Sequence, residues 1–171
     1  MIQSFLAMIL IVSASNYLVL FPINEWLTYG AFTYPVSFLI TELTNRFYGP
    51  KKARQVVYAG FAVALLFSIW LATPKIACGS GLAFLVSQLL DILVFNKLRQ
   101  ATWWQAPLFS SLLASMIDTM IFWTIAFWGE NVPIFTWALG DFSIKLVMDL
   151  AMLTPFRFAI RSTISMRPRT T

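Results

Sequence analysis

The chain has 171 residues, of which 59% are hydrophobic and 11% are charged, with a formal net charge of +5. Soluble domains carry about 25% charged residues, so this composition excludes an ordinary soluble protein and predicts an integral membrane protein. Cys78 is the only cysteine and histidine is absent, which excludes an internal disulfide and removes the usual zinc and haem ligands and His-based catalysis. We therefore expect no metal, no cofactor and no enzymatic activity.

Six apolar segments follow one another, separated by Pro, Gly or charged residues. Their lengths match the roughly 20 residues that a helix needs to cross a bilayer, and strand-like alternation is absent. The sequence therefore predicts an all-α membrane protein, a single domain over 1–171 with a basic cytoplasmic tail at 157–171. The predicted transmembrane helices cover about residues 2–22, 31–48, 56–73, 79–96, 107–128 and 135–156.

The basic residues are distributed unevenly over the predicted loops. Ten of the twelve Lys and Arg lie at 46–54, at 97–99 and in the tail, which all fall on one side of the predicted topology. Lys75 alone lies in a loop on the other side, and Lys145 lies within the last predicted helix. Lys and Arg favour cytoplasmic loops, so both termini are predicted to be cytoplasmic. This distribution explains the positive charge without nucleic-acid binding.

Ionisable side chains also occur deep within the predicted helices. Each costs roughly 2.5–3.5 kcal/mol at mid-bilayer on insertion scales, so such residues usually have a function. Those of this chain come from four predicted helices and are expected at a similar depth, which indicates a central binding pocket. They are Glu42, Asp91, Asp118, Lys145 and Asp149.

The segments 88–95 and 115–122 share a pattern, in which a polar residue lies three positions before an Asp and a Phe lies four positions after it. Asp91 and Asp118 are therefore expected to face each other across an antiparallel helix pair. The alternative is that they only clamp that pair. Small residues at four-residue spacing would let the two helices approach closely; they are Gly79, Ala83 and Ser87 on one helix, and Ser111, Ser115 and Thr119 on the other.

The deep groups comprise four carboxyl groups and one ammonium group. This excess of negative charge can be relieved by protons or by a ligand rich in N–H donors. Lys145 can also pair within its own helix, because Asp141 and Asp149 lie four positions before and after it. The predicted proton-coupling residues are Asp91, Asp118 and Asp149. The predicted substrate-binding residues are Asn16, Glu42, Asn45, Gln88, Asp91, Phe95, Asp118, Phe122, Trp123 and Lys145.

Three stretches of the chain, 34–50, 87–95 and 115–122, resemble the bacterial queuosine-precursor transporters, also called the vitamin uptake transporter family. The segment 96–100, the pair at 103–104, and Asp141 with Lys145 fit the same resemblance, which covers nearly the whole chain. The resemblance implies uptake of 7-cyano-7-deazaguanine or 7-aminomethyl-7-deazaguanine across the bacterial inner membrane, with or without proton coupling. Whether the protein forms a homodimer is left open.

A guanine-like base presents two adjacent N–H donors that one carboxylate can accept, and a carbonyl that an amide or a lysine can meet. The candidates for the donor edge are Glu42, Asp91 and Asp118. The candidates for the carbonyl are Asn45, Gln88 and Lys145.

Two alternative functions remain open from the residues alone. A substrate-capture subunit of an energy-coupling-factor transporter also has about six helices and would need an ATPase partner, since this chain has no GxxxxGK[ST] phosphate loop. An intramembrane aspartyl protease is indicated only by the dipeptide Gly140-Asp141 and lacks a second motif.

Overall fold

The computed structural model describes residues 1–71 and 73–165, which form helices joined by short loops. One isolated β-bridge joins Pro22 and Thr28 in the first loop. The predicted all-α fold is confirmed. The helices of the described residues are α1 (Ile2–Leu18), α2 (Gly30–Thr33), α3 (Val36–Tyr48), α4 (Pro50–Leu71), α5 (Pro74–Leu98), α6 (Gln105–Ala126) and α7 (Ile134–Ser165).

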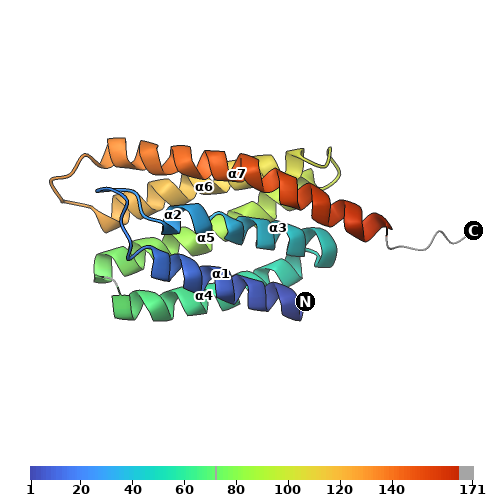
Figure 1. The fold of residues 1–171 in the computed structure, drawn as a ribbon, viewed down its shortest axis with the longest axis horizontal. Coiled ribbons are helices and arrows are strands. Elements are labelled where there is room, and N and C mark those ends of the chain that lie inside the picture. Colours follow the sequence, from blue (N-terminus) through green and yellow to red (C-terminus); the bar gives the residue numbers. More distant parts are fainter. Residues whose placement is uncertain (72, 166–171) are drawn as a thin grey trace, which may run out of the picture.

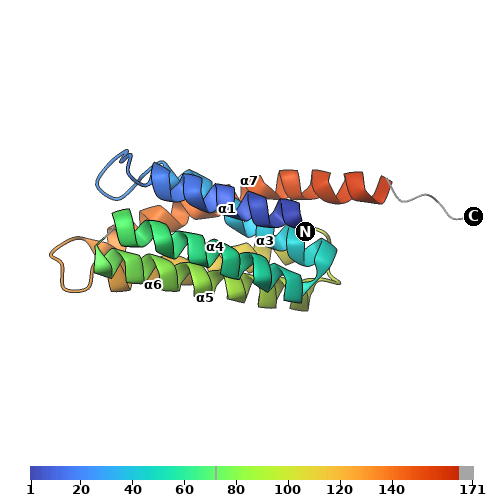
Figure 2. The ribbon, with the colours of Figure 1, turned by 90° about the horizontal axis from the view of Figure 1, so that it is seen from below.

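The long helices run side by side along the long axis of the molecule (Figures 1 and 2). The antiparallel pair α5 and α6 forms the centre; α4 and α1 pack in turn on the α5 side, and α7 packs on α6. The single turn α2 and the helix α3 are joined through Tyr34 and Pro35 and lie between α1 and α7. The break at Pro35 brings a tyrosine side chain to the middle of the bundle.

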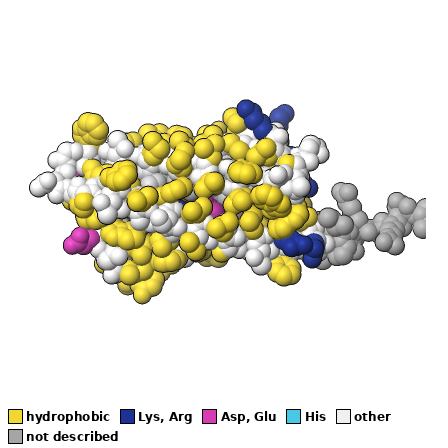
Figure 3. Space-filling view, turned by 90° about the horizontal axis from the view of Figure 1, so that it is seen from above, with side chains coloured by type: hydrophobic (Ala, Val, Ile, Leu, Met, Phe, Trp, Pro, Cys, Tyr) yellow, Lys and Arg dark blue, Asp and Glu magenta, His cyan; other side chains and the backbone are white. Residues whose placement is uncertain are grey.

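The described helices differ in how well they suit a bilayer. By length and composition α4, α5 and α6 could each cross a membrane, and α1 is a shorter apolar helix. The helix α3 has 13 residues, and α7 is long but carries Asp141, Lys145 and Asp149. In Figure 3 apolar side chains cover the middle of the visible face, while Lys and Arg gather towards one end. The protein is thus a membrane protein with several apolar helices, and the six crossings and their orientation stay predictions.

Three helices, α4, α5 and α7, extend beyond the apolar segments from which they were predicted, and α5 begins at Pro74 rather than near residue 79. The helix α4 begins at Pro50 rather than near residue 56, after a turn at Gly49 with a φ of 85°. Proline at the first helical position and glycine at a positive φ explain so tight a connection. The helix α7 continues to Ser165, past the predicted end at 156 and through Pro155. Hydropathy marks the part of a helix that suits lipid, not its full length. Residues 166–171 of the predicted tail lie outside the described part.

The expected close approach of α5 and α6 is confirmed at Gly79. A Cβ atom there would lie 3.2 Å from the backbone nitrogen of Ala126 and 3.3 Å from the backbone oxygen of Phe122. Backbone atoms cannot rotate away as a side chain can, so glycine sets the distance between these helices.

The end of the bundle that holds the turn at Gly49, the α5–α6 loop and the N-terminus is called the basic end, because Lys51, Lys52, Arg54, Lys97 and Arg99 lie there. At this end Nη1 of Arg46 donates to the carbonyl oxygen of Arg99 at 2.8 Å, and Nη2 of Arg99 donates to the carbonyl oxygen of Arg46 at 2.6 Å. Each guanidinium thus satisfies a carbonyl near the C-terminus of the other helix, α3 or α5, where the helix dipole favours a cation.

Candidate binding cavity

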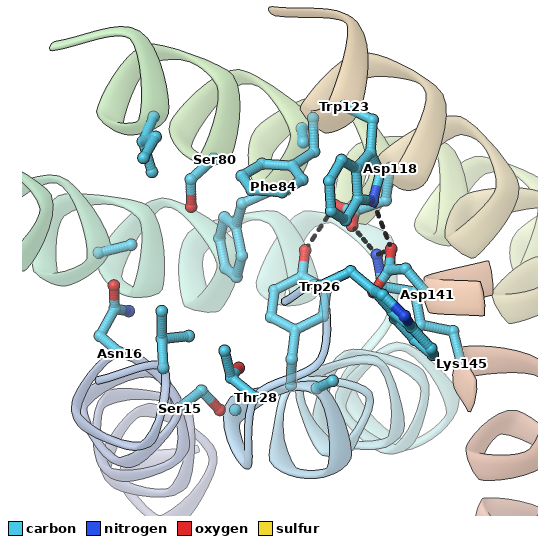
Figure 4. A pocket seen from close by; sticks show the side chains of 18 of the residues that line it. Ser15, Asn16, Trp26, Thr28, Ser80, Phe84, Asp118, Trp123, Asp141 and Lys145 are labelled. Carbon is cyan, nitrogen blue, oxygen red and sulfur yellow. Dashed lines mark hydrogen bonds and ion pairs between the residues drawn. The ribbon is translucent and has the colours of Figure 1, made fainter. Parts of the chain in front are cut away.

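A cavity of about 280 Å³ lies inside the bundle, between α1, α2, α5, α6 and α7. Glu25, Trp26 and Thr28 of the loop between α1 and α2 line it, so it lies towards the end of the bundle opposite the basic end. Figure 4 shows charged side chains on one wall of the cavity and the smaller polar side chains Ser15 and Asn16 on the facing wall. The cavity therefore has one charged wall and a facing wall with uncharged polar side chains.

The charged wall is organised around Lys145 of α7. Its Nζ lies 2.8 Å from Oδ2 of Asp118, 2.6 Å from Oδ2 of Asp141 and 3.0 Å from Oγ1 of Thr119. A lysine ammonium has three donors, so all three are used. The side chain of Lys145 is 6% exposed. A buried ammonium in contact with two carboxylates is compensated in charge, and the group of three keeps a formal charge of −1.

Asp118 of α6 accepts hydrogen bonds on both of its carboxylate oxygens. Its Oδ1 accepts a hydrogen bond from the Tyr34 hydroxyl at 2.7 Å and another from Ser87 at 3.1 Å, while Oδ2 faces Lys145. The donors come from the α2–α3 break, from α5 and from α7. One side chain therefore ties three parts of the bundle to α6, and the Lys145 ammonium also lies 5.7 Å from the centre of the Tyr34 ring.

Asp141 of α7 uses only one of its carboxylate oxygens within the described part of the chain. Its Oδ2 accepts from Lys145, from Thr119 at 2.9 Å and from Nε1 of Trp123 at 3.3 Å. Asp141 lines the cavity, and no hydrogen bond between described residues reaches its Oδ1. This oxygen is available to accept from an N–H group of a ligand.

Aromatic side chains provide a flat apolar surface next to the charged wall. The Trp123 ring stacks on Phe127 with centroids 4.9 Å apart and meets Phe122 edge to face. Trp26 packs on α7 where a Cβ atom at Gly140 would lie 2.7 Å from the indole, so glycine makes room for it. Phe84 completes the aromatic part of the lining. Such surfaces suit a planar ring.

The structure brings half of the predicted binding residues to this cavity. They are Asn16, Asp118, Phe122, Trp123 and Lys145. The pairing of Lys145 with Asp141 within α7 is also as predicted.

The other half lie outside the cavity lining, nearer the basic end: Glu42, Asn45, Gln88, Asp91 and Phe95. Gln88 is linked to the lining, because its Nε2 donates to Ser37 at 2.7 Å, and its Oε1 accepts from Thr41 at 2.6 Å. Phe95 packs edge to face against Phe156 in an apolar cluster. The deep polar residues thus form two groups rather than one layer.

The site also contains residues that the sequence did not single out as binding residues. Tyr34 and Trp26 are aromatic residues near predicted helix ends, and sequence alone does not distinguish them from the belts of aromatic residues at membrane surfaces. The sequence indicates Asp141 as a partner of Lys145, in the family resemblance and in the dipeptide Gly140-Asp141, but not as a binding residue. Its contacts with Trp123 and Thr119, both on a different helix, could not be predicted from the sequence.

An all-helical membrane protein with a charge-lined cavity inside its bundle has the architecture of a small-molecule transporter. The family model described as "Putative vitamin uptake transporter" matches residues 28–73 and 68–160. The chain belongs to this vitamin uptake transporter family, as its sequence motifs predicted, and the family is one of transporters rather than enzymes.

Relatives with curated names extend over most of the chain. The "Queuosine precursor transporter" of Escherichia coli (strain K12) is 34% identical, with 86% of this chain and 80% of the relative covered. The "Probable queuosine precursor transporter" of Haemophilus influenzae shows the same identity and coverage. That of Bacillus subtilis is 29% identical over 80% of this chain and 72% of its own length. No solved structure shows a significant match.

Proposed function

We propose that the protein imports a queuosine precursor, a 7-deazaguanine base, through the bacterial inner membrane, with its basic end in the cytoplasm. The observation that carries the proposal is the cavity wall of Asp118, Asp141 and Lys145. The names of the relatives support the substrate class, and the excess of Lys and Arg at one end supports the orientation.

The chemistry of the cavity supports a guanine-like ligand. The donor edge of such a base would meet the carboxylates, with Oδ1 of Asp141 as the acceptor that needs no rearrangement. The flat bicycle would lie on Trp123 and the neighbouring rings. A volume of about 280 Å³ lies just below the roughly 300–1,000 Å³ of ligand pockets, which favours a base over a nucleoside.

Restored tRNA modification is the expected result in a bacterium that makes no queuosine precursor and lacks its own importer. Cells that express the protein and receive a low external concentration of 7-cyano-7-deazaguanine should regain queuosine in tRNA. The Asp118→Asn variant should insert in the membrane but fail to restore it, because it loses the charge that pairs with Lys145. Full activity of this variant would contradict the role of the carboxylate.

Purified protein in liposomes separates this proposal from the energy-coupling-factor alternative. Uptake of 7-cyano-7-deazaguanine by the protein alone is expected. Uptake that appears only after an ATPase partner is added would show that the protein is a substrate-capture subunit rather than an independent transporter.

The aminomethyl precursor is expected to bind more tightly than the cyano precursor. The titratable side chains that line the cavity are Glu25, Asp118, Asp141, Lys145 and Tyr34; the first four sum to a formal charge of −2. A cationic ligand amine would gain a charge-assisted hydrogen bond there, so the dissociation constant should be about tenfold lower, or ~1.4 kcal/mol. Calorimetry with both bases measures the difference. Glu25→Gln should reduce it, and equal affinities would contradict the electrostatic argument.

A further inference from the structure

A second group of carboxyl groups lies between the cavity and the basic end. Glu42 of α3, Asp91 of α5 and Asp149 of α7 are 2%, 0% and 3% exposed, and none of them lines the cavity. They lie close enough to interact electrostatically with one another. No ion pair within the described ranges 1–71 and 73–165 reaches any of the three. We call these residues the inner carboxyl group.

The hydrogen bonds to the inner carboxyl group are too few for three carboxylates. Glu42 receives a long bond from Ser110 at 3.4 Å, and Asp149 receives one from Ser115 at 2.8 Å on Oδ2. By hydrogen-bond geometry, both oxygens of Asp91 and Oδ1 of Asp149 have no partner among the described residues, although the Ser110 hydroxyl lies near Asp91. A buried ionised carboxylate without donors costs several kcal/mol, so this arrangement does not suit three negative charges.

A neutral side chain beside them shows the same shortage of donors. Nδ2 of Asn45 donates at 3.2 Å to the carbonyl oxygen of Ile92, the residue that follows Asp91 on α5. This amide therefore lies at the α3–α5 interface. Asn45 is fully buried, and its Oδ1 accepts no hydrogen bond within the described part of the chain. The four unpartnered atoms are all acceptors. The site lacks hydrogen-bond donors, and a carboxylate that binds a proton becomes a donor.

We propose that Glu42, Asp91 and Asp149 form a proton-binding site, distinct from the substrate cavity, that couples substrate import to proton entry. The inference rests on the proposed transport function. A proton taken up from the outer side converts a carboxylate of this site to a carboxyl group, and its release on the cytoplasmic side restores the carboxylate. The buried oxygens of this site that have no partner among the described residues are all acceptors, which a bound proton would satisfy.

Hydroxyl groups of α6 contact two members of the inner carboxyl group. Ser115 lies three residues before Asp118 of the cavity wall, on the same helical face, and donates to Asp149. Five residues before Ser115, the Ser110 hydroxyl contacts Glu42 at 3.4 Å. Serine hydroxyls both donate and accept, so they can pass a proton between carboxyl groups.

The charged groups around the inner carboxyl group come from several helices. On α6 and α7 these are Asp118 and Lys145, which are paired with each other, and on α3 it is Arg46, which is bonded to the Arg99 carbonyl oxygen. The charged residues of α4 are Lys51, Lys52 and Arg54 in its first turns. The inner carboxyl group therefore has no dedicated cation among the described residues, and a proton is the positive charge that it can acquire.

Liposomes that contain a pH-sensitive dye test the proposal directly. Addition of 7-cyano-7-deazaguanine outside should acidify the interior of vesicles that hold the wild-type protein, and an inward proton gradient should drive accumulation. Asp91→Asn should abolish both gradient-driven accumulation and acidification, because an amide cannot exchange a proton. Calorimetry should still detect the ligand in this variant, since Asp91 does not line the cavity. The exposed Glu130→Gln serves as the matched control and should behave as wild type.

The outcomes distinguish this proposal from the proposed function. Wild-type uptake without acidification, uptake driven by sodium instead of protons, or gradient-driven accumulation by Asp91→Asn would each overturn the proton site while leaving transport intact. Should Asp91→Asn fail to fold, Asp149→Asn takes its place, and the wild-type measurement decides on its own. Absence of any deazaguanine binding or uptake would instead overturn the proposed function.

Discussion

Replacement of Lys145 by Met is expected to abolish ligand binding and to lower the free energy of unfolding by about 3–5 kcal/mol. The substitution removes three hydrogen bonds and leaves Asp118 and Asp141 as buried charges without a cation. Met has nearly the same length, so loss of packing is a minor contribution. Thermal or denaturant unfolding in detergent measures the stability, and calorimetry with 7-cyano-7-deazaguanine measures binding.

Two further variants separate charge from shape in this experiment. Lys75→Met breaks the ion pair with Glu130, whose side chains are 58% and 51% exposed, and should change stability by about 0–1 kcal/mol. The double variant Lys145→Met with Asp118→Asn should recover part of the stability but not binding, because it removes one uncompensated charge. An Lys145→Met protein as stable as wild type would contradict the view that the two carboxylates need this cation.

Leucine at Gly79 is expected to prevent α5 and α6 from packing at their native distance. The new side chain would begin 3.2 Å from a backbone nitrogen of α6, and overpacking of this kind costs about 3 kcal/mol or less, occasionally more. The yield of monodisperse protein and its melting temperature should both fall. The matched control is Gly81→Leu on the same helix.

At Gly81 the nearest atom to a new Cβ would be Cε2 of Phe61, at 3.5 Å, and this side chain can rotate. We therefore expect a smaller loss of stability from Gly81→Leu than from Gly79→Leu. Equal losses from the two leucines would show that the α5–α6 contact does not depend on glycine at position 79.

The sequence predicted the fold class because apolar segments bounded by Pro and Gly indicate which parts of the chain lie in lipid and which lie in water. It predicted the helix ends poorly where a helix continues beyond its apolar segment. Lys51, Lys52 and Arg54 are polar, yet they belong to the first turns of α4. The predicted segment 31–48 includes most of the four-residue helix α2 before Pro35, because the interruption at Tyr34 and Pro35 does not change hydropathy.

Part of the candidate site was also accessible from the sequence. Asp118 and Lys145 were predicted because charged residues within apolar helices seldom lack a role, and both line the cavity. The separation of Asp91 from Asp118 was not predictable. Position along a helix gives approximate depth, but the partners of a side chain depend on helix rotation and tilt, as with Tyr34 reaching Asp118 from a residue 84 positions away.

The crossed arginines at the basic end bear on leakage. A transporter whose cavity opened to both sides at once would act as a pore and dissipate the ion gradients of the cell. Arg46 and Arg99 each bond to the main chain of the other, so separation of α3 and α5 at this end breaks both charge-assisted bonds together. Each of these bonds contributes about 1.5–3 kcal/mol, and together they favour the closed state of this end. The cell would therefore lose few ions through it while the cavity is accessible from the other end.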